Sequence, residues 1–142
     1  MLKFAFLSDK FYEDYADCPE IEQKQKRPYI QIEVMIDGVL FGVPLRSSIK
    51  HPHVLWTDKQ NRCGVDFSKS VVISRPDDYI DKTTTPHIRP NEFNALRGKE
   101  HVIQEKLKKY IADYKKAKER PDLERNRMIL RYSTLQYFEK YL

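Results

Sequence analysis

The chain has 142 residues, of which 33% are charged and 40% are hydrophobic, and its formal net charge is +5. This length predicts one domain with a hydrophobic core, and the composition excludes a wholly disordered chain. No apolar run approaches the roughly 20 residues that a membrane-spanning helix requires, so we expect no membrane partner.

The first predicted elements are a strand and a polar segment. Residues 2–7 form a short apolar run that ends in charged residues, which predicts a strand rather than a signal peptide, and hence a cytoplasmic protein. Residues 9–25 are polar and acidic, and we interpret them as a long excursion or a short helix. Cys18 and Cys63 have no spacing typical of a disulfide framework or a metal site, so both thiols are expected to be reduced.

A β-hairpin follows. Apolar and more polar residues alternate over residues 30–36, which is the period-two pattern of a half-buried strand. Asp37-Gly38 comes next, a dipeptide that accepts the positive φ angles of a two-residue hairpin turn, and residues 39–43 then return antiparallel. Because the two strands are nearly equal in length, the residues before the first strand are expected to meet those after the second.

Basic and hydroxyl side chains gather at this open end of the hairpin. Lys26 and Arg27 precede the first strand, and Arg46, Ser47 and Lys50 follow the second. Fixed cations beside a hydroxyl, at the end of a rigid sheet, predict a site that holds a phosphodiester and cleaves it. The alternative is an ordinary polar turn whose hydroxyls bond the local backbone.

The next segment, residues 47–63, shows no sustained period, and we interpret it as a long surface loop. Its two histidines, His51 and His53, are candidates for proton transfer near neutral pH, or are bystanders in an exposed loop. No Asp, Glu or His stands beside them at a recognisable zinc spacing, so we expect no metal and no cofactor.

Strand character resumes over residues 64–73 and stops at Arg75-Pro76, and the Thr-rich residues 79–88 are expected to add one short strand. Ser68 and Lys69 offer further polar groups to the hairpin site if their strand lies alongside it.

From Asn91 the hydrophobic period becomes helical, and Arg120-Pro121 ends it. Asp122 is placed to cap a second helix, and residues 133–136 have capping-box spacing for a last turn. Strands gathered ahead of helices predict an α+β fold: a compact, strongly bent antiparallel sheet or open barrel with packed carboxy-terminal helices.

Charge is unevenly distributed along the chain. Residues 1–94 hold 13 Lys/Arg against 14 Asp/Glu, whereas residues 95–142 hold 13 against 7. Such asymmetry indicates a surface for a polyanion, or else a helix with a solvated basic face. A basic groove with aromatic side chains beside it is what single-stranded RNA requires. We expect RNA contacts from Tyr12, Tyr29, Lys50, His51, Trp56, Ser68, Lys106 and Lys109.

Three features in this order resemble a known family: the hairpin with Pro44-Leu45-Arg46-Ser47, residues 64–73, and the amphipathic helical tail. They look like the toxin of a type III toxin–antitoxin system, nearest to the TenpN branch of the ToxN/AbiQ group. The resemblance covers residues 2–142 and rests on pattern and order more than on a long motif. It implies a barrel-like fold related to the MazF/Kid toxins and a metal-independent, sequence-selective endoribonuclease.

The same resemblance implies partners and a setting. The inhibitor would be a small structured antitoxin RNA, excised from a repeated precursor, that fills the active groove. Cellular or phage RNA would be the substrate, and toxin and antitoxin RNA would form a higher-order assembly. The host would be a bacterium, with a role in plasmid maintenance or in abortive phage infection.

Site residues transfer from the family unevenly. Ser47 matches the serine that follows the Pro-Leu-x block, and Arg46 stands where a threonine is common. The family's catalytic lysine precedes the first hairpin strand, where this chain has Arg27, with Lys26 one residue earlier. Arg27 suits electrostatic stabilisation, whereas Lys26 or Lys69 would transfer a proton if neighbouring cations lower its pKa. The proton-transfer group therefore stays open.

The implied reaction is attack of an RNA 2′-hydroxyl on its own adjacent phosphate, which leaves a 2′,3′-cyclic phosphate and a 5′-hydroxyl. Ser47 would hydrogen-bond the phosphate or its leaving oxygen, and the cations would stabilise the developing charge. The competing interpretation is a non-catalytic RNA-binding module, which the basic tail and the aromatic residues would serve equally well.

Overall fold

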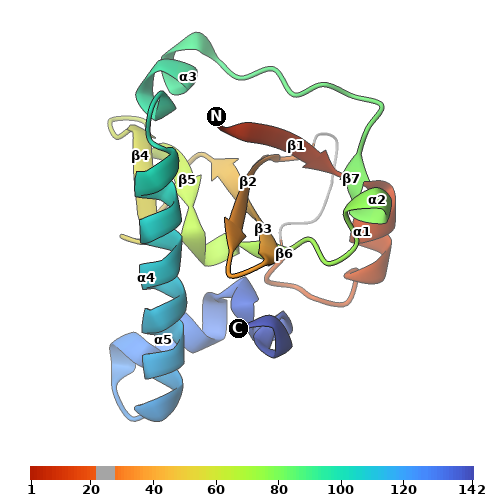
Figure 1. Cartoon of the computed structure of the whole chain (residues 1–142). Coiled ribbons are helices and arrows are strands. Elements are labelled where there is room, and N and C mark those ends of the chain that lie inside the picture. Colours follow the sequence, from red (N-terminus) through yellow and green to blue (C-terminus); the bar gives the residue numbers. More distant parts are fainter. Residues whose placement is uncertain (22–27) are drawn as a thin grey trace.

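A computed structural model of the chain describes residues 1–21 and 28–142, so the predictions for Lys26 and Arg27 fall outside the described residues. The predicted α+β class is confirmed: an open antiparallel sheet is combined with helices that include the carboxy-terminal ones (Figure 1). The strands are β1 (Lys3–Leu7), β2 (Ile30–Ile36), β3 (Val39–Arg46), β4 (Val54–Asp58), β5 (Cys63–Asp66), β6 (Val71–Val72) and β7 (Ile80–Asp81).

The helices follow the strands in the chain, apart from two short ones. They are α1 (Asp9–Asp14), α2 (Pro76–Tyr79), α3 (Pro90–Leu96), α4 (Glu100–Glu119) and α5 (Glu124–Tyr132), with the 3₁₀ helices η1 (Phe67–Lys69), η2 (Thr134–Tyr137) and η3 (Glu139–Tyr141). Figure 1 shows α4 along one side of the sheet, α1 and α2 on the opposite side, and the carboxy-terminal helices below it. None of the described helices is both long enough and apolar enough to cross a membrane.

The sheet order is β4-β5-β3-β2-β1-β7, and β6 also pairs with β3. The predicted hairpin forms its centre: β2 and β3 pair antiparallel from Ile36↔Val39 to Gln31↔Pro44. Its turn has φ angles of 49° at Asp37 and 81° at Gly38, as a tight turn with two positive φ angles requires.

The strand predicted at residues 64–73 is interrupted. Leu45 of β3 pairs with Val65 and Gly42 pairs with Val71, so two residues of β3 lie opposite residues 66–70. These five residues do not pair with β3: Asp66 ends β5, where it still pairs with Val54 of β4, and residues 67–69 form η1. Asp66 caps η1 by accepting a hydrogen bond from the Ser68 N–H. Pro44, one of the two β3 residues opposite, has no N–H to donate to a ladder, which favours a break at this point.

The segment interpreted as a surface loop contains β4, which pairs with β5 from Val54↔Asp66 to Asp58↔Cys63. The strand is short and its period is weak, because four of its five residues are only half-buried at the edge of the sheet. Sequence periodicity detects such an edge strand poorly. Each of its faces is partly buried and partly exposed, so its residues do not alternate between apolar and polar.

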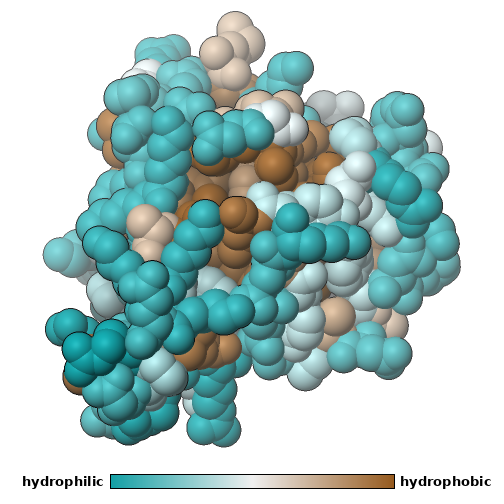
Figure 2. Space-filling model, turned by 60° about the horizontal axis from the view of Figure 1, so that its bottom comes forward, coloured by the Kyte–Doolittle hydropathy of each residue, from teal (hydrophilic) through white to brown (hydrophobic). Residues whose placement is uncertain are grey.

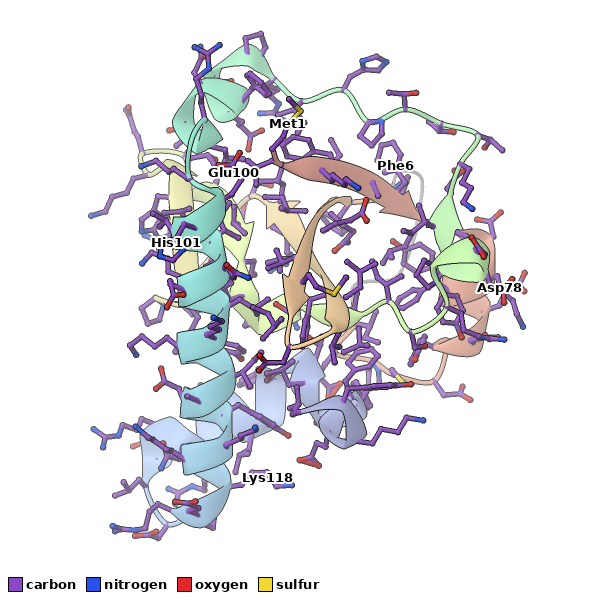
Figure 3. The ribbon with its side chains drawn as sticks, in the orientation of Figure 1. Met1, Phe6, Asp78, Glu100, His101 and Lys118 are labelled. Atoms are coloured by element: carbon purple, nitrogen blue, oxygen red, sulfur yellow. The ribbon has the colours of Figure 1, made fainter. Side chains whose placement is uncertain are left out.

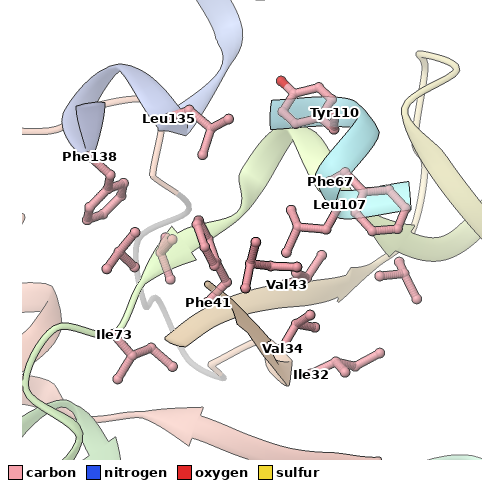
Figure 4. Packing of buried hydrophobic residues seen from close by; sticks show 14 of the residues in the cluster. Ile32, Val34, Phe41, Val43, Phe67, Ile73, Leu107, Tyr110, Leu135 and Phe138 are labelled. Carbon is pink, nitrogen blue, oxygen red and sulfur yellow. The ribbon is translucent and has the colours of Figure 1, made fainter. Parts of the chain in front are cut away.

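The predicted amphipathic helix is two helices. Gly98 has a φ angle of 73°, a conformation that ends α3 before α4 begins at Glu100. On α4 the buried stripe runs along one face and packs on the sheet and on η1, where Leu107 and Tyr110 lie near Phe67 (Figure 4). Figure 3 shows Glu100 at the start of α4 close to Met1, whose amino nitrogen is 3.6 Å from the Glu100 carboxylate.

The carboxy-terminal segment closes the core under η1. Ser133 caps η2, but its hydroxyl accepts from the Leu135 N–H and not from the Gln136 N–H that a capping box would use. The buried Thr134 hydroxyl donates to the Ser68 and Ser70 carbonyls. Leu135 and Phe138 are fully buried (Figure 4). Seen from below, hydrophobic surface fills the middle of this face and hydrophilic side chains frame it (Figure 2).

Candidate functional site

A cleft of about 560 Å³ opens at the end of the hairpin where basic residues were expected to converge. The hairpin register places Tyr29 opposite Arg46, and the Arg46 guanidinium carbon is 5.9 Å from the centre of the Tyr29 ring. The far wall is the segment that joins β7 to α3, which runs past β1 from one side of the sheet to the other (Figure 1). The cleft is lined by Phe6, Pro28, Tyr29, Ile30, Leu45, Arg46, Ser47, Cys63, Asp81, Thr84, His87, Ile88, Arg89 and Glu92.

A buried carboxylate holds Arg46 in place. Asp66 has no exposed side-chain surface, and its Oδ2 accepts a hydrogen bond from Arg46 Nη1 at 2.6 Å. The other oxygen, Oδ1, accepts from the Ser68 backbone N–H at 3.0 Å and from the Ser68 hydroxyl at 2.6 Å, and it lies 3.0 Å from His51 Nε2. Burial alone would raise the pKa of Asp66, but the bonds from His51, Ser68 and Arg46 outweigh it and lower that pKa below its usual value.

The Arg46 side chain is only 19% exposed, so the charge beside the cleft is fixed rather than mobile. A guanidinium whose position is set by a buried carboxylate does not have to reorganise when an anion arrives. Ser47, the next residue, is exposed at the mouth of the cleft. Of the residues predicted to converge at this end of the hairpin, Arg46 and Ser47 line the cleft, Lys50 does not, and Lys26 and Arg27 lie outside the described residues.

His51 lies behind this pair. Its Nδ1 accepts a hydrogen bond from the His53 backbone N–H at 3.0 Å, so the proton of the neutral ring resides on Nε2. Nε2 lies 3.0 Å from the Ser68 hydroxyl and 3.0 Å from Asp66 Oδ1. Both ring nitrogens are therefore engaged inside the protein, and His51 supports Asp66 rather than presenting a nitrogen to the cleft.

The far wall contributes ionisable groups that sequence reasoning did not select. His87 and Arg89 are exposed on the segment before α3, and Glu92 lies in the first turn of α3. The Glu92 carboxylate accepts a hydrogen bond from Thr57 of β4 at 3.1 Å and is 3.9 Å from Arg89 Nε. The hydrogen bond from Thr57 therefore joins the far wall to β4, and the contact with Arg89 lies within the far wall.

A second, smaller hollow of about 170 Å³ lies beyond the other end of β5. Lys106 and Lys109 of α4 border it, together with His53, whose ring centre lies 5.2 Å from that of Tyr110. Burial, and then the neighbouring His51, lowers the pKa of His53 below its usual value. The remaining lining residues are Pro52, Val54, Phe67, Tyr110 and Asp113.

Other predicted site residues lie elsewhere. Tyr12 is 8% exposed and packs in the core, which raises its pKa to about 12 through burial, so it does not fit the role of a stacking surface. Lys69 donates hydrogen bonds to the Glu20 carbonyl at 2.9 Å and to the Tyr132 carbonyl at 3.4 Å, and it does not line the cleft. The Lys69 ammonium therefore links η1 to Glu20 and to Tyr132, which are distant from it in the sequence.

Trp56 and Lys50 also lie outside both the cleft and the hollow. The Arg62 guanidinium covers the half-buried Trp56 ring at 4.9 Å from its centre, and Lys50 is exposed. Ser68 is 7% exposed and contacts Asp66, so its hydroxyl acts inside the network and not on a ligand.

Asp66 is the most informative residue that the predictions left out. Its signal was present in the sequence, because a single acidic residue stands between Val65 and Phe67 in an apolar segment. A carboxylate buried in such a segment requires charged or hydrogen-bonding partners, which points to an organised polar network. His87 and Arg89 had no comparable signal.

No group of three or more His, Cys, Asp or Glu residues that would suit a metal ion occurs in the described part of the chain. Comparisons of the chain with models of protein families, with curated protein sequences and with solved structures found no match.

Proposed function

We propose that this protein is an endoribonuclease whose cleft at the end of the β2–β3 hairpin holds the scissile phosphate. The observation that carries the proposal is Arg46, fixed by the buried Asp66 carboxylate at 2.6 Å, beside the exposed Ser47 hydroxyl in that cleft. A prepositioned cation and a hydroxyl donor suit the charge that develops on a phosphorane. Tyr29, on the same wall, offers a ring face for an unstacked base.

The mixed charge of the cleft favours a nucleotide over a bare anion. Arg46 and Arg89 face a ligand together with the carboxylates of Asp81 and Glu92. A phosphate alone would be repelled by the carboxylates. A nucleotide satisfies both signs, because its phosphate accepts hydrogen bonds while its 2′-hydroxyl and base amino groups donate them.

In the proposed reaction, the RNA 2′-oxygen forms a bond to the adjacent phosphorus and the bond from phosphorus to the 5′-oxygen breaks. The proton of the 2′-hydroxyl passes to the carboxylate of Glu92, and His87 gives a proton to the leaving 5′-oxygen, since both residues line the cleft. Arg46 stabilises the added negative charge, and Ser47 donates a hydrogen bond to a phosphate oxygen. The products are a 2′,3′-cyclic phosphate and a 5′-hydroxyl.

The biological role that fits this chemistry is that of a bacterial toxin of a type III system, held inactive by a small structured antitoxin RNA. Support comes from the resemblance in element order and from the net charge of +5, whose excess lies in residues 95–142. An RNA inhibitor would occupy the cleft through the same contacts as an RNA substrate. The proposal includes a cytoplasmic setting and an assembly of toxin with antitoxin RNA.

The test is cleavage of RNA by the purified protein in the presence of excess chelator. We expect fragments that begin with a 5′-hydroxyl, which a polynucleotide kinase phosphorylates directly, and that end with a cyclic phosphate. Arg46→Ala is expected to abolish these fragments. The matched control is Arg75→Ala, which removes an exposed guanidinium that pairs with Asp14 and does not line the cleft.

A second function, a non-catalytic RNA-binding module, is favoured by one observation: both ring nitrogens of His51 are engaged inside the protein. That function predicts RNA that binds tightly and stays intact, with no toxicity on expression. The proposed toxin role is tested by expressing the protein in bacteria with and without the DNA that lies just upstream of its coding sequence. Growth arrest that upstream tandem repeats relieve supports the toxin, and intact RNA together with normal growth contradicts it.

A further inference from the structure

The hollow between His53 and α4 has the character of an anion site. Lys106 and Lys109 stand one turn apart on α4, and both border the hollow. Lys109 pairs with Asp113 at 2.7 Å, whereas Lys106 forms no ion pair with any residue of 1–21 or 28–142. Two ammonium groups against one carboxylate leave a positive excess at the hollow.

The inner wall of the hollow is formed by packed rings and is partly shielded from solvent. His53 packs its ring against Tyr110 at 5.2 Å and against His51 at 5.6 Å. Because its pKa is lowered, the His53 ring is neutral at neutral pH and offers a hydrogen bond rather than a charge. A volume of about 170 Å³ is too small for a folded domain but suits a single phosphate group and its nearest sugar atoms.

The hollow and the cleft lie at opposite ends of one strand. Cys63, the first residue of β5, lines the cleft, and Phe67, directly after the last, lines the hollow. A strand rises about 3.3 Å per residue, so these two positions are roughly 13 Å apart. A stacked nucleic acid strand advances about 3.4 Å per nucleotide, so about four nucleotides, or fewer in an extended strand, cover that distance.

We propose that the hollow binds a second backbone phosphate of the RNA strand whose scissile phosphate lies in the cleft. This inference rests on the proposed function and specifies its substrate: a single-stranded segment several nucleotides long that reaches from the cleft to α4. All four residues of β5 are buried, so the segment runs in the direction of β5 across the surface that covers it. The affinity for short RNAs that fill only the cleft therefore does not depend on Lys106 and Lys109.

The test compares the binding of a dinucleotide and an octanucleotide that carry 2′-O-methyl groups, which removes the attacking hydroxyl and prevents cleavage. We expect the octanucleotide to bind the full chain more tightly than the dinucleotide. Lys106→Ala/Lys109→Ala is expected to lose this gain, several-fold at low salt, while its affinity for the dinucleotide stays near that of the unaltered protein.

The matched control is Lys108→Ala/Lys115→Ala, which removes two exposed lysines of the same helix that do not border the hollow. This control keeps the net charge equal to that of the test variant. The slope of log affinity against log salt for the octanucleotide should fall by about 0.7 for each RNA phosphate that the variant no longer neutralises, and only in the test variant.

The outcomes separate the two proposals. Equal decreases in affinity in the test and control variants would show that net charge alone accounts for the length effect, and would overturn the second phosphate site. Equal affinities of the unaltered protein for both oligonucleotides would also overturn it, while leaving RNA cleavage at the cleft in place. An absence of binding to either RNA would overturn the proposed function and this inference together.

Discussion

The cleft and the hollow flank the same strand, but their cations are held in opposite ways. In the cleft, Arg46 is anchored by Asp66, which is wholly buried and has Ser68 and His51 as further partners. At the hollow, Lys106 and Lys109 project from an exposed helix face, and the Asp113 carboxylate on that wall is itself 31% exposed. A fixed charge suits the stabilisation of a transition state, whereas flexible surface charges suit salt-dependent binding.

The largest expected effect concerns stability. Asp66→Ala leaves the Arg46 and His51 groups without their buried carboxylate, and removing one partner of a buried pair costs about 3–5 kcal/mol in the free energy of unfolding. The equivalent change at the hollow, Asp113→Ala, breaks an exposed pair worth about 0–1 kcal/mol. Urea denaturation measures both. Similar decreases in the two variants would contradict the distinction between the two regions.

A second effect concerns catalysis. Ser47→Ala removes one hydrogen-bond donor from an exposed position, so its free energy of unfolding should change by less than about 0.5 kcal/mol. Its rate of RNA cleavage at saturating substrate should fall about 100- to 1000-fold, the usual cost of losing a donor to a developing oxyanion. Lys109→Ala should instead raise KM and leave kcat nearly unchanged. Steady-state kinetics on one labelled RNA would show whether that split exists.

A third effect concerns base stacking at the cleft. Tyr29→Ala removes the aromatic wall, and stacking of one base on an aromatic side chain is worth about 1–3 kcal/mol in binding. Tyr29→Phe keeps the ring and serves as the control. Fluorescence anisotropy with a short single-stranded RNA measures the affinities. A decrease in affinity in Tyr29→Phe as large as that in Tyr29→Ala would assign the effect to the hydroxyl instead of the ring face.

The smallest effect concerns pH. Burial, together with His51, lowers the pKa of folded His53 below its ordinary value of 6.5, so the folded state binds this proton less readily than the unfolded state. The contribution of His53 to stability is therefore complete above pH 6.5 and is lost as the pH falls below that value. Asp66, whose pKa is lowered below 3.8, adds a further loss of stability at more acidic pH.

His53→Gln removes the first of these two pH effects. The free energy of unfolding of this variant should vary less with pH just below 6.5 than that of the unaltered protein, as denaturation at a series of pH values would show. An unchanged pH profile would mean that His53 has the same proton affinity in the folded and unfolded states.

Several features of this protein follow from the sequence alone, because short-range periods and turn residues determine them. The alternation over β2, the Asp37-Gly38 turn and the apolar stripe of α4 all repeat over, or depend on, residues that are at most four positions apart in the chain. The register of the hairpin follows from its turn, and it is enough to bring Tyr29 opposite Arg46.

Other features were decided only by the tertiary structure, because they depend on segments that are far apart in the chain. Residues 66–70 do not pair with β3 opposite Val43 and Pro44, and this break places Asp66, the last residue of β5, at the centre of a buried network. The segment before α3 contributes His87 to the cleft only because the chain runs past β1 on its way from β7 to α3. No local sequence period predicts such contacts between distant segments. Their free energy comes from packing and charge pairing between elements that share no sequence pattern.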